Sequence, residues 1–369
     1  MQGTLTQDAP AAAARSPIWS SIDRLIDADP PREALQRHGI VPLAIERWRA
    51  SGRPIPSDLL AAERAWRFAA LSVRGVLTQV RAAYDGPIVV FKGPTAAARY
   101  PHGARSYGDI DLLVEDAAAA QRALLAEGFI EVDEPDLFAD IHHLRPLRWE
   151  GLPLDLELHS RPKWPDRLTG PRFAEIRDAA VDSGLGVDGI LTPCREHHTM
   201  LLVAHGWAHS PLRSVRDLLD VAAMAEGLDR RELDELARRW DLERVWATTA
   251  AAIDYLAGER ARKPAPLRIW AGHLGALRDQ TVLEAHLDRW VGAYWGLPFG
   301  EATAEGFAHL KWDLRPAYGE RSSERAARAW LSLRRAFVAQ SEHERELGEI
   351  ATRRDLRRVI RERRAAERP

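Results

Sequence analysis

The sequence of 369 residues has a single cysteine, no long apolar run and almost no net charge. Cys194 alone cannot form an intramolecular disulfide framework or a cysteine cluster for zinc, so we expect a reducing, cytoplasmic location. No stretch reaches the ~18 uninterrupted apolar residues of a membrane helix, so no membrane association is expected. A formal net charge of −2 provides no overall basic field, which disfavours a long nucleic acid as partner.

The sequence does contain enough apolar residues for a packed globule, since 46% of them are hydrophobic. The chain is longer than one typical core, so we expect two or three subdomains. The alanine-rich start lacks a basic region followed by an apolar core, which favours a tail over a signal peptide. In chain order we expect a disordered tail (1–17), an N-terminal helical arm (18–84), a sheet-containing core (85–192), a C-terminal helical domain (193–342) and a charged helical tail (343–369).

The pattern within residues 85–192 predicts a small mixed sheet. Short apolar or alternating runs predict strands near 87–92, 109–115, 128–133, 143–149 and 153–160, with a helix over 116–127. Upstream, apolar positions recur at helical spacing through 59–84, so a helix should lead directly into the first strand. The fold class expected is therefore α+β, with helices before and after the sheet.

The most informative motif is a pair of acids in a predicted strand. Residues 109–114 read Asp-Ile-Asp-Leu-Leu-Val, and the strand period of two places Asp109 and Asp111 on one face. Two carboxylates so close raise at least one pKa, and a bound hard cation such as Mg²⁺ (or Mn²⁺) removes that penalty. The pair is a candidate metal site, although an Asp-x-Asp pair alone is common on solvated strands.

A second predicted strand supplies a third acid. In residues 152–159, leucines alternate with Asp155, Glu157 and His159, which therefore share a face. If the two strands are neighbours, Asp109 and Asp111 converge with either Asp155 or Glu157. Three carboxylates on adjacent strands can form a two-metal site, in which one ion activates the attacking oxygen and the other neutralises a leaving phosphate. Nucleotidyl transfer is the reaction class that this arrangement indicates.

The turn after the first predicted strand suggests a phosphate site. Lys92 could supply a positive charge, Gly93 would allow close backbone approach, and Thr95 carries a hydroxyl, whereas Pro94 has no amide hydrogen to donate. Arg105 could bind a phosphate or orient a carboxylate. Two plainer interpretations stay open, because Lys92 could merely pair with an acid of the site and Arg105 could be an ordinary loop arginine.

Residues 88–114 and 154–159 together resemble the DNA polymerase β-like nucleotidyltransferase superfamily, specifically its bacterial branch known as the uncharacterised nucleotidyltransferase family. In that branch an apolar strand ends in Lys-Gly, an Arg precedes Asp-Ile-Asp-Leu-Leu-Val, and a later strand reads acid-apolar-His. The resemblance extends to residues 34–43 and 196–222, and the latter segment contains Asp220. Matching acid-apolar-His selects Glu157 as the third acid and leaves Asp155 as the alternative.

The resemblance implies Mg²⁺-dependent transfer of a nucleoside monophosphate from an NTP, such as ATP, with pyrophosphate leaving. Asp109, Asp111 and Glu157 would be the catalytic and metal-binding acids, and Lys92 with Gly93 would bind the phosphates. The acceptor stays open among small molecules, peptides and proteins. The alternative is a non-catalytic nucleotide-binding or partner-binding scaffold on the same fold.

Two histidines of the helical segment are also candidates. His205 and His209 lie four residues apart on a predicted helix and so share a face, but no nearby cysteine completes a zinc site. We expect them to form hydrogen bonds between the helices and the sheet and, with His159, to line the cleft.

Overall fold

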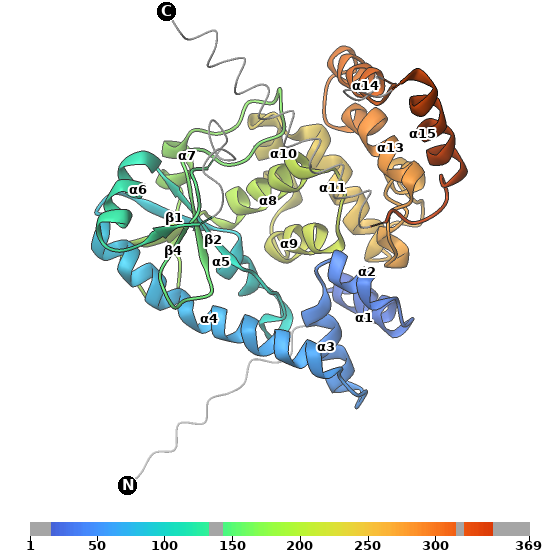
Figure 1. Ribbon diagram of the computed structural model, residues 1–369. Helices are drawn as coiled ribbons and strands as arrows, with labels where there is room; N and C mark the ends of the chain where they lie inside the picture. Colours follow the sequence, from blue (N-terminus) through green and yellow to red (C-terminus); the bar gives the residue numbers. More distant parts are fainter. Residues whose placement is uncertain (1–15, 133–142, 315–320, 342–369) are drawn as a thin grey trace, which may run out of the picture.

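The computed structural model describes residues 16–132, 143–314 and 321–341 (Figure 1). Most of the predicted N-terminal tail (1–17) and all of the predicted charged tail (343–369) lie outside the described residues. Within the described ranges, no helix combines the length and the apolar character needed to cross a membrane.

The described strands form one mixed sheet with the order β3-β4-β5-β2-β1-β7-β6. The strands are β1 (Ile88–Phe91), β2 (Asp109–Val114), β3 (Ile130–Glu131), β4 (Leu147–Arg148), β5 (Asp155–His159), β6 (Val181–Asp182) and β7 (Ile190–Thr192). β2 is antiparallel to β1 and parallel to β5, and β7 is parallel to β1. The α+β class with a small mixed sheet, predicted from the sequence, is confirmed.

Helices precede, interrupt and follow the sheet. The N-terminal helices are α1 (Pro17–Asp27), α2 (Arg32–Arg37), α3 (Val41–Ala50) and α4 (Ser57–Ala83), and those between strands are α5 (Gly93–Ala97), α6 (Ala117–Ala126) and α7 (Phe173–Asp178). After the sheet come α8 (Arg195–His209), α9 (Val215–Ala225), α10 (Arg230–Arg239), α11 (Glu243–Leu256), α12 (Ala265–Ile269), α13 (Val282–Val291), α14 (Phe299–Leu314) and α15 (Ser322–Arg334). Short 3₁₀ turns lie at Pro101–Gly103, Leu274–Ala276 and Gly292–Trp295.

The two faces of the sheet are covered by different helices. Ile88 and Val90 of β1 pack against α4, in a core that also includes residues of α6. Val89 and Phe91, which alternate with them, pack on the opposite side with residues of α8 and α10. By the same alternation, Asp111 on β2 lies on the face that α8 covers. The acids therefore face the C-terminal helices and not α4.

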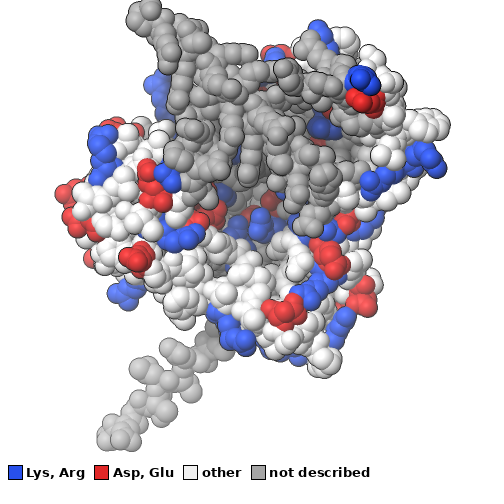
Figure 2. All heavy atoms as spheres, viewed as in Figure 1, with Lys and Arg blue, Asp and Glu red and all other residues white. Residues whose placement is uncertain are grey.

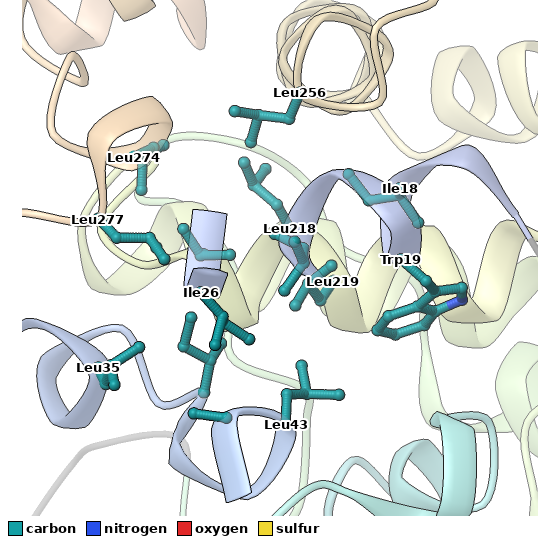
Figure 3. Packing of buried hydrophobic residues seen from close by; sticks show 14 of the residues in the cluster. Ile18, Trp19, Ile26, Leu35, Leu43, Leu218, Leu219, Leu256, Leu274 and Leu277 are labelled. Carbon is teal, nitrogen blue, oxygen red and sulfur yellow. The ribbon is translucent and has the colours of Figure 1, made fainter. Parts of the chain in front are cut away.

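The N-terminal helices share a hydrophobic core with the C-terminal ones. Ile26 of α1 and Leu35 of α2 are buried together with Leu219 of α9 and Leu256 of α11 (Figure 3). Helices from both ends of the described chain therefore build one core. Figure 1 shows the sheet on one side of α8 and α9, and α13 to α15 on the far side of the molecule.

Side-chain caps begin the helices α6 and α9. The Asp116 carboxylate accepts the amide hydrogen of Ala119 at 2.8 Å and caps α6, which begins three residues after β2 ends. The Ser214 hydroxyl accepts the amide hydrogen of Asp217 at 3.2 Å and starts α9. Both side chains satisfy an amide that the first turn of a helix leaves without a partner.

Candidate active site

The parallel pairing of β2 with β5 brings the predicted acids together. Asp109 lies opposite Asp155, and Asp111 lies opposite Glu157. Residues opposite each other in parallel strands point to the same face, so all four carboxylates start from one side of the sheet. The two strands are neighbours, as expected, and their acids share one face of the sheet.

The structure separates the two candidates for the third acid. Asp155 accepts a hydrogen bond from Nε of Arg148 on β4 at 2.7 Å, and both side chains are partly exposed. Glu157 lines a pocket with Asp109, and its carboxylate lies 3.4 Å from Nε2 of His159. Ligand atoms of Asp111, Glu157 and His159 all lie within 4.8 Å of one another. The geometry favours Glu157 as the third acid and adds His159 to the group.

Asp111 is the buried centre of this group. Its Oδ1 accepts hydrogen bonds from Nζ of Lys92 at 3.0 Å and from Nε2 of His159 at 3.1 Å. Burial alone would raise the pKa of Asp111, but Lys92 and His159 outweigh it and hold the pKa well below its usual range. Burial lowers the pKa of Lys92 and of His159, but the carboxylates around them, Asp111 and Glu157 among them, raise both pKa values by more. These two partners, Lys92 and His159, therefore favour the ionised form of Asp111.

The same residues fit a divalent cation. The second oxygen of Asp111, Oδ2, is buried and has no hydrogen-bond partner among the described residues. Burial and the charge of Asp111 raise the pKa of Asp109, and Lys92 offsets only part of that effect. Unsatisfied carboxylate oxygens and like-charge repulsion are both relieved by a hard cation with oxygen ligands.

The Lys-Gly turn holds an unusual backbone conformation. Lys92 has φ of 62°, which is uncommon outside glycine, and its amide donates a hydrogen bond to Nε2 of His198 at 3.0 Å. Gly93 follows with φ of 33°, and a Cβ there would lie 3.0 Å from the carbonyl oxygen of Asp109. Glycine at this position therefore favours the close approach of β1 and β2 at the acids, and its positive φ is one that other residues rarely adopt.

Thr95, whose hydroxyl was a candidate for phosphate binding, makes its hydrogen bond within the turn itself. The Thr95 hydroxyl donates a hydrogen bond to the Lys92 carbonyl oxygen at 2.8 Å and is buried. His198, for which no sequence pattern predicts a chemical role, accepts a hydrogen bond from the Lys92 amide, because burial lowers its pKa to about 3 and favours the neutral ring. No local pattern could identify this contact, since 106 residues separate the partners.

Arg105 ties this turn to α9. Its guanidinium donates two hydrogen bonds to the Asp220 carboxylate, at 2.6 and 2.7 Å, and one to the Gly93 carbonyl oxygen at 3.2 Å. The Tyr100 hydroxyl donates to the same carboxylate at 2.6 Å. Burial raises the pKa of Asp220, but Arg105 outweighs it and the net shift is downward. Because the Arg105–Asp220 pair is buried and bidentate, we assign Arg105 a positioning role.

The cleft histidines have different surroundings. His159 is buried beside Asp111, and His205 lines the same pocket as Asp109 and Glu157. His209 ends α8, but its side chain lies outside the described part of the structure. His205 therefore lines the pocket, His159 is buried beside Asp111 and is not part of the pocket lining, and the place of His209 stays a prediction.

A pocket of about 490 Å³ opens over these residues. Lys92, Gly93, Asp109 and Glu157 form its sheet side, and α8 and α9 form the opposite side. Charged side chains of both signs gather in the hollow at the centre of the face drawn in Figure 2. The volume lies within the range usual for small-molecule sites, so a nucleotide-sized ligand fits.

A family model matches most of the sequence that builds this site. No curated protein matches the chain. The model of the uncharacterised nucleotidyltransferase family matches residues 26–258, which include the sheet, the acids, the Lys-Gly turn and α9. The predicted resemblance is confirmed at the level of the family. This chain belongs to the uncharacterised nucleotidyltransferase family and is an enzyme of nucleotidyl transfer.

Proposed function

We propose that this protein transfers a nucleoside monophosphate from an NTP to a small-molecule, peptide or protein acceptor in a reaction that requires Mg²⁺ or Mn²⁺. The observation that carries the proposal is the pairing of Asp111 with Glu157 on adjacent strands, with a buried oxygen of Asp111 left without a hydrogen bond among the described residues. A non-catalytic scaffold has no need for such a group, so the acids support the enzyme over that alternative.

The acids and the turn would have distinct roles. Asp109, Asp111 and Glu157 would hold the metal, which when bound neutralises phosphate charge and helps to orient the attacking oxygen. Lys92 balances the charge of Asp111 before the substrate binds and lies in the pocket wall, where it can also contact a phosphate. The Gly93 backbone allows the nucleotide to approach the strand ends.

The reaction balances as a substitution at phosphorus. The acceptor oxygen forms a bond to the α-phosphorus, the bond from that phosphorus to the oxygen of the β-phosphate breaks, and pyrophosphate and the acceptor proton leave. Positioning of the two reactants in one pocket would supply much of the rate. A cytoplasmic setting, which provides NTPs and keeps Cys194 reduced, is part of the proposal.

The test is release of pyrophosphate from each of the four NTPs with Mg²⁺, with and without an extract as a source of acceptor. Asp111→Asn and Glu157→Gln should each lower turnover at least about 1,000-fold, because each removes a charge from the metal site. Asp155→Asn decides between the two third acids, and we expect it to retain most activity. Turnover that is insensitive to Asp111→Asn, or lost in Asp155→Asn and kept in Glu157→Gln, would contradict the proposed site.

A further inference from the structure

His159 lies beside the acids of the site and outside the pocket. It is only 1% exposed, and it does not belong to the described residues that line the pocket. On β5 it follows Glu157 by two residues, so the strand period turns both side chains to the same face of the sheet. A side chain in this place is screened from a substrate in the pocket, and it acts on the proposed reaction only through the acids.

The His159 ring contacts acids on two neighbouring strands. Its Nε2 lies 3.1 Å from Oδ1 of Asp111 on β2 and 3.4 Å from Oε2 of Glu157 on β5. Because an ionised carboxylate can only accept, the hydrogen of these contacts belongs to Nε2. Phe91 supports the plane of the imidazole through an edge-to-face contact, with ring centroids 5.4 Å apart and an interplanar angle of 75°. One N–H group therefore bridges the two acids.

The two oxygens of Asp111 have different surroundings. Oδ1 accepts hydrogen bonds from Lys92 and His159, whereas Oδ2 is buried and has no hydrogen-bond partner within the described ranges. A hard cation prefers oxygen ligands, so Oδ2 is the atom that it would take. To bind the ion itself, Nε2 of His159 would have to lose its hydrogen and its contact with Oδ1. This division leaves His159 beside the metal ligands and not among them.

We propose that His159 is a positioning residue, which holds the carboxylates of Asp111 and Glu157 for the metal through its Nε2–H group and is not itself a ligand. The inference rests on the proposed function and deepens it, because it assigns the group that orients two of the metal ligands. Hydrogen bonds to the ligands of a metal site typically change its metal affinity about 10- to 100-fold. His159 would thus set the affinity without contact to the ion or the substrate.

The first test is pulsed electron paramagnetic resonance of Mn²⁺ bound to the full chain without nucleotide, with and without isotopically labelled histidine. A histidine nitrogen bound directly to Mn²⁺ gives a strong nitrogen coupling, whereas a histidine behind the carboxylates does not. We expect no directly bound histidine nitrogen in wild type. A strong coupling that changes with the label and disappears in His159→Gln would identify His159 as a ligand and overturn the proposal.

The second test measures the dissociation constant of Mn²⁺ for three variants. His159→Leu removes the donor and should weaken binding about 10- to 100-fold. His159→Gln keeps an N–H group and should restore most of the affinity, whereas His159→Glu supplies a possible ligand but no donor and should not. His197→Leu is the matched control, because His197 is also a buried histidine but packs on Trp240, 4.7 Å between ring centroids, and is outside the described pocket lining.

The remaining outcomes separate the positioning role from the proposed function. The role is wrong if His159→Leu binds Mn²⁺ as wild type does, if Glu restores affinity and Gln does not, or if His197→Leu weakens binding equally. If Mn²⁺ binding follows the prediction and is lost in Asp111→Asn, but no NTP releases pyrophosphate with any acceptor source, the role stands and the proposed function fails. If wild type binds no Mn²⁺, both are wrong.

Discussion

Two buried carboxylates in the helical part of the molecule, Asp220 on α9 and Asp288 on α13, have opposite surroundings. Asp220 accepts two hydrogen bonds from Arg105 and one from Tyr100. Asp288 accepts one from the Ser210 hydroxyl at 2.7 Å, and its other oxygen has no hydrogen-bond partner within the described ranges. Burial is common to both, so the partner decides whether the carboxylate stays charged.

The pKa values follow these partners. Arg105 outweighs burial and lowers the pKa of Asp220, whereas burial raises the pKa of Asp288 to about 7 because Ser210 compensates only in part. Asp220 lies inside the family match and connects to the Lys-Gly turn, while Asp288 lies beyond it. The carboxylate whose charged form is favoured, Asp220, is therefore the one whose ion pair joins α9 to the Lys-Gly turn.

Replacement of Arg105 should cause the largest loss of folding stability. Arg105→Met leaves the Asp220 charge buried without its cation, so we expect a loss of about 3–5 kcal/mol in the free energy of unfolding. Turnover should also fall, since Arg105 holds the Gly93 carbonyl. Denaturant titration measures the stability, and pyrophosphate release measures the turnover.

Arg148→Met provides the matched control for that variant. Arg148 also pairs with a carboxylate, Asp155, but both side chains are at least 30% exposed. A pair so exposed should contribute no more than about 1 kcal/mol. Equal losses for Arg105→Met and Arg148→Met would show that burial of the Asp220 pair has no special energetic role.

Asp288→Asn should remove a pH dependence of stability. The folded pKa of about 7 lies above the ordinary value of 3.8, so the folded state binds the proton more tightly. This contribution is fully present below about pH 4 and is lost as pH rises to 7, with an upper bound of about 4 kcal/mol. The difference in unfolding free energy between wild type and variant should follow that curve, and a difference independent of pH would refute it.

Gly93→Ala should have a smaller effect on stability but a clear one on turnover. Its Cβ would meet the Asp109 carbonyl oxygen, so the strand ends must separate at the acids. Gly103 also has a positive φ, but a Cβ there meets nothing within 4 Å, so Gly103→Ala costs only the backbone strain of about 1–2 kcal/mol. We expect turnover to fall at least tenfold more in Gly93→Ala. Equal turnover in the two variants would contradict the close approach at Gly93.

Local patterns predicted the sheet centre well. The strand period placed Asp109 and Asp111 together, and the structure has the expected strands at 88–91, 109–114 and 155–159. β6 and β7 did not stand out, because strands of two and three residues are too short for a period to show. The strand pattern could not choose between Asp155 and Glu157, since both share a face. Their tertiary contacts separate them: Asp155 is bonded to Arg148, whereas Glu157 lines the pocket and lies beside His159.

Long-range partners were beyond any local pattern. His198 contacts Lys92 and Asp220 contacts Arg105 across more than 100 residues. The sequence marked Asp220 through its resemblance to the family and gave His198 no role. Lys163 and Arg213, which line the same pocket as Asp109, carry no sequence motif, because only the folded chain brings these segments together.

The central claim is that Asp111 and Glu157, with Asp109, form a divalent-metal site that binds a nucleotide. A crystal grown with Mn²⁺ and a non-hydrolysable NTP analogue tests it most directly, through the anomalous signal of manganese. The account predicts a peak within about 2.5 Å of Oδ2 of Asp111 and of a Glu157 oxygen, with the triphosphate in the pocket. A peak beside Asp155, or a bound nucleotide with no metal at Asp111, would contradict it.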